Sequence, residues 1–111
     1  MNQDTMAQLK FSCRFDEKEG SYYLSLSLCQ ERGRQEGDSW YKNIDALVLS
    51  PYFKVNPLRS GFVPGEDDYR TEKEFKIVSK NHHIGKEIEV LLLVRNQTIY
   101  HHTIEDISQL L

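Results

Sequence analysis

All four histidines of the chain occur in two adjacent pairs, His82-His83 and His101-His102. Imidazole binds zinc, copper, iron and nickel, so a four-histidine metal site is the chemistry that these residues could support. However, we expect a strand over 86–95 between the pairs, which would separate them by roughly 30 Å. Neighbouring side chains on a strand also point to opposite faces. We therefore expect no metal and no cofactor, with the first pair in a loop.

The two cysteines, Cys13 and Cys29, could form a disulfide or supply a nucleophile. A disulfide requires Cα atoms within about 7 Å and converging side chains. In the hairpin described below, Cys13 lies on the core face opposite Leu24, whereas Cys29 lies on the other face. No Cys-X-X-Cys motif marks either thiol as reactive. We therefore expect Cys13 to be a small buried apolar residue.

An acidic cluster, Glu66-Asp67-Asp68, lies in a polar segment at 61–74. Calcium is bound by several carboxylate and carbonyl oxygens that converge from a loop. These acidic residues lack the spacing of an EF-hand, and Lys73 neutralises part of their charge. We expect a solvated charged loop, with calcium or small-ligand binding by this loop as the alternative function.

The sequence contains none of the common catalytic motifs. It has no Gly-X-Ser-X-Gly, no glycine-rich phosphate loop and no His-Glu-X-X-His. A pair of carboxylates that work as acid and base would need a shared pocket, which the sequence does not indicate. We therefore expect a protein that is not an enzyme and has no catalytic residues.

Length and charge narrow the class of protein further. A chain of 111 residues predicts one domain over 1–111, with 1–5 disordered and 56–72 as a long loop. The net charge of −3 argues against a nucleic-acid partner, and no apolar run is long enough to span a membrane. The first residues lack the pattern of a signal peptide, so we expect a cytoplasmic protein with reduced cysteines.

Strands are indicated by alternation of apolar and polar residues. Segments 9–15 and 22–28 should pair as an antiparallel hairpin, because only one register puts both apolar sets on one face. In that register Leu9 faces Leu28, Phe11 faces Leu26, Cys13 faces Leu24 and Phe15 faces Tyr22. Further strands are expected at 44–49, 52–55, 75–78, 86–95 and 98–104.

About seven strands with turn signals between them predict an all-β fold, an immunoglobulin-like antiparallel β-sandwich. A small β-barrel is the alternative. The last nine residues, 103–111, fit a short helix in which Thr103 and Asp106 resemble a capping box, and they fit equally a continued strand or a docked tail.

The strand over 86–95 is apolar on both faces, because Leu91 and Leu93 lie opposite its main apolar set. A turn at Asn96-Gln97 would put Tyr100, His102 and Ile104 beside these two leucines. Strand 44–49 repeats the pattern with Leu47 and Leu49. A sandwich has one inner face per sheet, so something must cover the second apolar face. The cover could be the chain's own tail, Trp40 and Tyr52, or another protein. The predicted interaction surface comprises Leu91, Leu93, Tyr100, His102, Ile104, Leu110 and Leu111.

The order of features over residues 44–105 resembles a known family. The features are Leu47-Val48-Leu49, Phe53-X-Val55-X-Pro57, a polar loop, Phe75-X-Ile77, a connection ending in Gly85, and Ile88-X-Val90 with a returning strand. Together they resemble the immunoglobulin-like β-sandwich modules that accompany effector or sensor domains in bacterial multidomain signalling proteins. The resemblance implies a non-catalytic interaction or assembly module whose partner is another protein or a second copy. Because the chain begins with Met1 and is short, we expect a stand-alone adaptor or small subunit.

Overall fold

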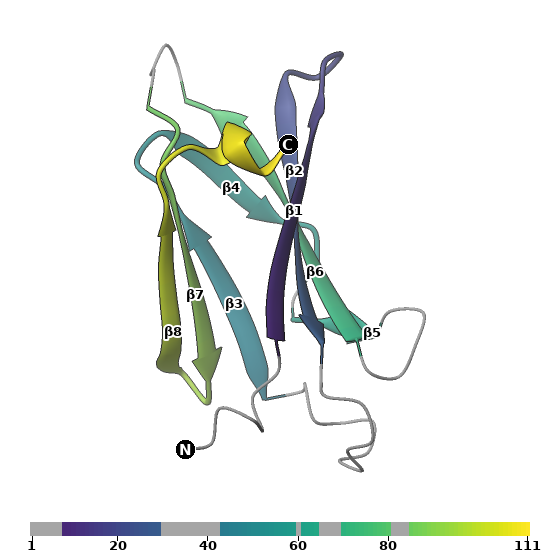
Figure 1. Ribbon diagram of the computed structural model, residues 1–111, viewed down its shortest axis with the longest axis vertical. Coiled ribbons are helices and arrows are strands. Elements are labelled where there is room, and N and C mark those ends of the chain that lie inside the picture. Colours follow the sequence, from purple (N-terminus) through teal and green to yellow (C-terminus); the bar gives the residue numbers. More distant parts are fainter. Residues whose placement is uncertain (1–7, 30–42, 60, 65–69, 81–84) are drawn as a thin grey trace.

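The computed structural model describes residues 8–29, 43–59, 61–64, 70–80 and 85–111, and their arrangement is all-β (Figure 1). The elements are β1 (Gln8–Asp16), β2 (Ser21–Cys29), β3 (Ile44–Leu49), β4 (Phe53–Pro57), β5 (Val63–Pro64), β6 (Arg70–Ser79), β7 (Ile88–Val94), β8 (Gln97–Ile104) and a single 3₁₀ turn, η3 (Ile107–Leu110).

The strands form two antiparallel sheets, one with the order β1-β2-β6-β4 and the other with the order β3-β7-β8. The two-residue strand β5 pairs with β6. This strand order is that of the constant-type immunoglobulin sandwich. The predicted antiparallel β-sandwich is therefore confirmed, and the described strands do not close into a barrel.

The inner faces of the two sheets enclose one apolar core. Its buried members come from six of the strands, from the segment before β5 and from η3: Leu24, Leu26, Leu28, Ala46, Val48, Phe53, Phe62, Phe75, Ile77, Ile88, Val90, Leu92, Ile104 and Ile107. Strands β2, β3, β6 and β7 each contribute alternate residues, as the period of a β-strand requires.

The β1–β2 hairpin has the predicted register, with Phe15 opposite Tyr22 and Cys13 opposite Leu24. The tight turn between the strands ends at Gly20, whose φ of 72° lies in the left-handed region that glycine adopts without strain. The alternating apolar residues specify this register, because a slip of one residue would turn one whole set away from the core.

The prediction of one long loop over 56–72 is wrong in part. This segment contains β5 and the first residues of β6, which starts at Arg70 instead of near Phe75. Residues 60 and 65–69 lie outside the described part of the chain. The start of β6 was hidden because two of its buried, inward-facing positions are polar, namely Thr71 and Lys73.

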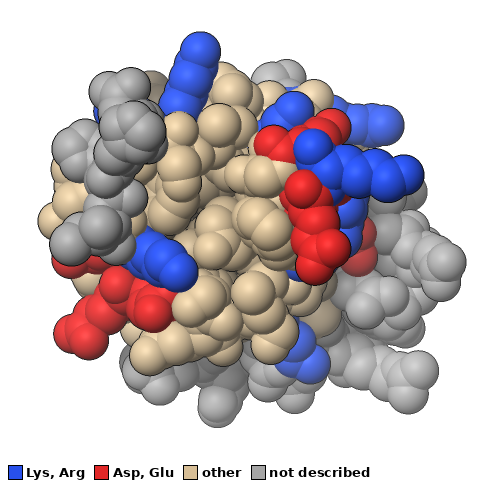
Figure 2. Space-filling view, turned by 90° about the horizontal axis from the view of Figure 1, so that it is seen from above, with Lys and Arg blue, Asp and Glu red and all other residues tan. Residues whose placement is uncertain are grey.

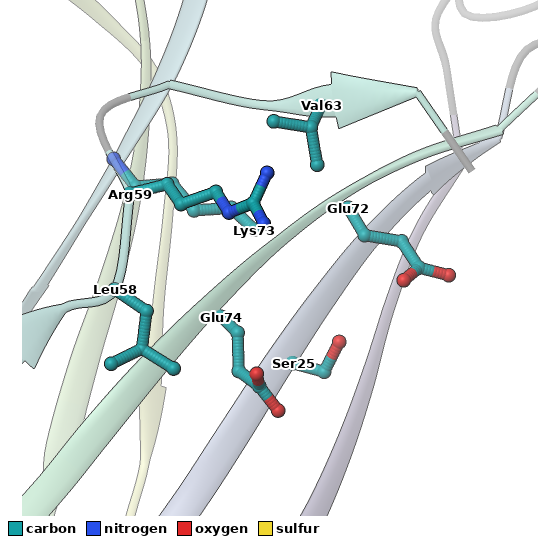
Figure 3. A pocket seen from close by; sticks show the side chains of 7 residues that line it. All are labelled: Ser25, Leu58, Arg59, Val63, Glu72, Lys73 and Glu74. Atoms are coloured by element: carbon teal, nitrogen blue, oxygen red, sulfur yellow. The ribbon is translucent and has the colours of Figure 1, made fainter.

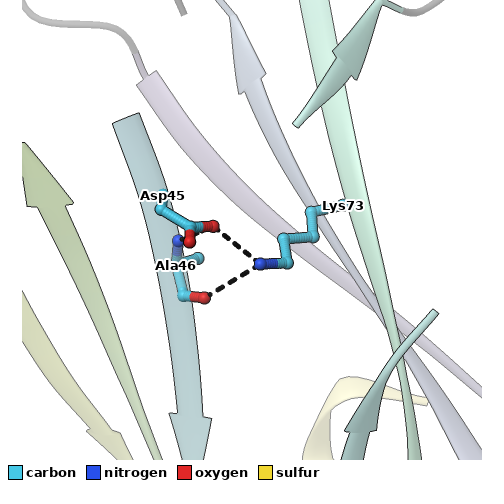
Figure 4. Close-up of polar contacts among 3 residues, drawn as sticks. All are labelled: Asp45, Ala46 and Lys73. Carbon is cyan, nitrogen blue, oxygen red and sulfur yellow. Dashed lines mark hydrogen bonds and ion pairs between the residues drawn. The ribbon is translucent and has the colours of Figure 1, made fainter. Parts of the chain in front are cut away.

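Lys73 lies on the inner face of β6 and connects the two sheets (Figure 4). Its Nζ donates to Asp45 Oδ1 at 2.6 Å and to the Ala46 carbonyl oxygen at 3.2 Å, both on β3. The Ala46 N–H also donates to Asp45 Oδ1, at 2.8 Å. Because β3 is an edge strand, half of its backbone groups have no strand partner, and these side chains satisfy both backbone groups of Ala46.

The turn between β7 and β8 differs from the prediction. Its central residues are Arg95 and Asn96, both with positive φ, at 53° and 68°. Two positive φ values in a two-residue turn are typical of type I′ hairpins. A β-bulge interrupts the register between Leu92 and Leu93, so Val90 faces His102. The predicted turn at Asn96-Gln97 was wrong because arginine rarely adopts the left-handed region.

The C-terminal segment continues as strand to Ile104 and then forms η3 beside β1. Asp106, and not Thr103, caps this turn, since its carboxylate accepts from the backbone N–H and the hydroxyl of Ser108, at 2.9 and 2.6 Å. Ile107 is fully buried, and its N–H donates to the Lys86 carbonyl at 2.9 Å. The tail is thus docked against the end of the core.

Candidate functional site

Four leucines lie on the face of the β3-β7-β8 sheet that points away from the core. They are Leu47 and Leu49 on β3 and Leu91 and Leu93 on β7, and we call them the outer leucine face. Leu47 pairs directly with Leu91. Leu47 and Leu49 remain 44% and 49% exposed, although the same strand buries Ala46 and Val48 on its other side. The edge strand β3 therefore presents two exposed leucines beside those of the central strand β7.

The predicted interaction surface is divided between two faces of this sheet. Leu91 and Leu93 belong to the outer leucine face, whereas the bulge turns Tyr100, His102 and Ile104 to the inner side of β8. Placing these three beside the leucines was therefore wrong. Ile104 is buried in the core, so it is not available to a partner in the folded chain.

Tyr100 and His102 instead lie at the seam between β8 and β1. The His102 ring stacks on Phe11 of β1 at a centroid distance of 5.9 Å and on Tyr100 at 6.2 Å. Phe11 is itself packed against the core. These ring contacts link β8 to β1, and Tyr100 remains 37% exposed.

Leu110 and Leu111 lie at the end of the sandwich, with η3, and not on the outer leucine face (Figure 1). Leu110 packs against the core, while Leu111 is 62% exposed. Figure 2 looks down on this end, where uncharged side chains occupy the centre and Lys, Arg, Asp and Glu gather at the rim. The tail therefore does not cover the second face of the sheet, as the sequence had left open. Tyr52 packs against the core, and Trp40 lies outside the described residues.

A hollow of about 340 Å³ adjoins the outer leucine face next to the β7–β8 turn. We call it the turn hollow. It is lined by Asn43, Asp45, Leu47, Leu93, Arg95 and Asn96. Depressions of this kind commonly receive the anchor side chains of protein interfaces.

The two carboxylates on the outer side of this sheet each have a partner. Asp45 is paired with Lys73, and Glu89 lies 2.8 Å from Nε2 of His101. The leucines are thus flanked by carboxylates that already have a hydrogen-bond or ion-pair partner. The centre of the outer leucine face is apolar. The carboxylates of Asp45 and Glu89 beside it already have partners, so they do not need a cation from another molecule.

A second cavity, of about 440 Å³, lies where the chain leaves β4 and returns as β5 (Figure 3). Ser25, Leu58, Arg59, Val63, Glu72, Lys73 and Glu74 line it. Part of the proposed ligand loop at 61–74 therefore borders a cavity. The acidic residues of the calcium hypothesis, Glu66, Asp67 and Asp68, lie outside the described residues.

The remaining chemical groups show no assembled centre in the part of the chain that the structure describes. No three of its His, Cys, Asp and Glu side chains come together as metal ligands there. His82 and His83 lie outside this part. Cys13 and Cys29 are free and only partly buried, and burial raises the pKa of the Cys13 thiol to about 11. Among the described residues, no helix has the length and apolar character needed to cross a membrane.

Comparison of the chain with protein-family models, with curated proteins and with solved structures found no match.

The leucines of the candidate face could be identified from the sequence, but the pairing of their strands could not. Leu47, Leu49, Leu91 and Leu93 are all visible as a second apolar set on their strands. That β3 and β7 are neighbours is a long-range pairing, which alternation within each strand does not specify. The sequence did not indicate Arg95 as a residue of this face, because the turn was expected at Asn96-Gln97 and Arg95 was assigned to the preceding strand.

Proposed function

We propose that the protein is a non-enzymatic interaction module, an adaptor or small subunit, that binds another protein through the outer leucine face. The observation that supports this most strongly is the exposed pair Leu47 and Leu49 beside Leu91 and Leu93. Complete burial of an exposed leucine side chain contributes roughly 1.5–3 kcal/mol, and Leu47 and Leu49, which are about half exposed, would each gain about half of that on binding.

The area of the three-stranded sheet limits how much of an interface the outer leucine face can supply. Three strands with three outward rows cover about 14 Å by 20 Å, or roughly 280 Å². A stable specific interface uses about 800 Å² on each partner. The leucines are therefore the centre of the interface, and its rim extends over neighbouring elements such as the β7–β8 turn.

Site-specific photo-crosslinking tests this function directly. p-Benzoylphenylalanine is placed at Leu47, and, as a control, at Ser12, an exposed residue on the outer side of the other sheet. We expect irradiation in the cells that make the protein to give a defined adduct from position 47 only. The mass of the adduct separates a second copy from a different protein. Adducts that are identical from both positions, or none from position 47, would overturn the proposal.

A second candidate function is binding of calcium or a small ligand at the cavity between β4 and β5. Its volume of about 440 Å³ supports this, because ligand pockets span roughly 300–1,000 Å³. A ligand that binds only the folded chain raises the melting temperature by mass action. A thermal shift on addition of millimolar calcium, absent in Glu74→Gln, would favour this candidate. An unchanged melting temperature would remove calcium as the ligand.

A further inference from the structure

The charge of the turn hollow is set by which of its ionic groups are already paired. The Asp45 carboxylate is held by the Lys73 ammonium at 2.6 Å, and by the Ala46 N–H. The Arg95 guanidinium, by contrast, makes no hydrogen bond or ion pair with any described residue. Among the described residues, the Arg95 guanidinium is therefore the cation of this lining that has no anionic partner.

The rest of the lining is apolar or neutral. Leu47 and Leu93 form an apolar wall, and the amides of Asn43 and Asn96 are neutral hydrogen-bonding groups. A ligand that complements this set carries an aliphatic or aromatic side chain together with a negative charge a few ångströms away. A cationic ligand would meet Arg95, and the Asp45 carboxylate of the described lining is already paired with Lys73.

The backbone of Arg95 is consistent with a role for its side chain. Its φ of 53° lies in the left-handed region, and so does that of Asn96. Asparagine and glycine take this conformation readily, whereas arginine does so with strain. The two-residue turn places Arg95 in the lining of the hollow.

We propose that the turn hollow binds an acidic-apolar segment of the partner protein, in which an apolar side chain contacts Leu47 and Leu93 and an adjacent carboxylate pairs with Arg95. This rests on the proposed function, since it names the chemistry of the partner at the outer leucine face. Arginine is well suited to the contact because its planar guanidinium can bind a carboxylate through two parallel hydrogen bonds.

The experiment uses two small probes that differ only in charge, N-acetyl-L-leucine and N-acetyl-L-leucinamide. Each is titrated into the ¹⁵N-labelled chain to tens of millimolar, and amide shifts are followed by NMR. We expect both to shift the amides of Leu47, Leu93 and Asn96. The carboxylate probe should bind about twofold to fivefold more tightly, the range of exposed ion pairs.

The variants Arg95→Gln and Arg95→Lys identify the cation. Arg95→Gln should make the two probes equal, whereas Arg95→Lys should keep part of the preference. The control Arg14→Gln alters an arginine that lies over the Tyr23 ring on the other sheet, and should leave the preference unchanged. Equal affinities in the unaltered chain, a preference that survives Arg95→Gln, or no shifts with either probe would overturn the inference. A crosslink from position 47 alongside any of these results would leave the interaction function standing.

Discussion

The Lys73 ammonium on β6 lies 2.6 Å from the Asp45 carboxylate on β3 and so joins the two sheets of the sandwich by one ion pair. The Lys73 side chain is only 4% exposed, whereas Asp45 is 54% exposed. The same carboxylate borders the turn hollow. This pair thus joins the two sheets and gives the carboxylate that borders the turn hollow a cationic partner.

Removal of the Asp45 charge should be costly because the buried Lys73 ammonium would keep only neutral acceptors, the Ala46 carbonyl and the asparagine amide oxygen. We expect Asp45→Asn to lower the free energy of unfolding by about 1–3 kcal/mol in urea denaturation. In a Lys73→Met background the same change should cost much less, since no buried cation remains. Glu105→Gln, at an exposed carboxylate, is the control. Equal costs in both backgrounds would contradict this account of the pair.

The thiol of Cys13 should be protected from alkylation and should make stability depend on alkaline pH. Burial raises its pKa to about 11, from about 8.5–9 in an unfolded chain. The folded state therefore keeps its proton where the unfolded state loses it, so this contribution is complete below pH 9 and declines between about pH 9 and 11. Urea denaturation across this range should show a smaller decline in Cys13→Ala. The same slope in both proteins would refute the assignment.

The Asp106 cap of η3 should stabilise the folded chain most at pH values above the ordinary pKa of an aspartate. The hydroxyl of Ser108, and then its backbone N–H, donate to Asp106 and hold the pKa of this carboxyl below its usual value. A lowered folded-state pKa means that the stabilisation is present above about pH 4 and is lost as the pH falls further. Asp106→Asn should therefore melt at a lower temperature than the unaltered chain at pH 6, and the difference should shrink towards pH 3. A difference that is constant with pH would indicate that charge is not involved.

The sequence predicted those parts of the fold that the alternation of apolar and polar residues specifies without any other interaction. The register of β1 against β2 follows from this alternation, because Leu24, Leu26 and Leu28 must all face the core. The early start of β6 was not predictable in this way. A lysine at an inward position reads as a surface residue until its partner on another sheet is known.

The candidate face was only partly predictable for a related reason. Its leucines were visible, but the bulge between Leu92 and Leu93 changes which side of β8 faces them. No glycine or proline marks this bulge, and Arg95 occupies a turn position that usually favours asparagine or glycine. The unpredicted bulge therefore puts Tyr100 and His102 on the inner face and not beside the leucines.

Binding of another protein at the outer leucine face can be tested with a matched pair of variants. Leu47→Asp adds a charge to this face, and Leu58→Asp adds the same charge at a leucine that is exposed to a similar extent, 48% against 44%, outside it. The crosslinked partner, or a second copy of the chain, is measured for binding to both variants by sedimentation. We predict that Leu47→Asp loses binding at least tenfold while its melting temperature stays close to that of the unaltered chain, and that Leu58→Asp binds normally. Equal binding by the two folded variants would contradict the claim.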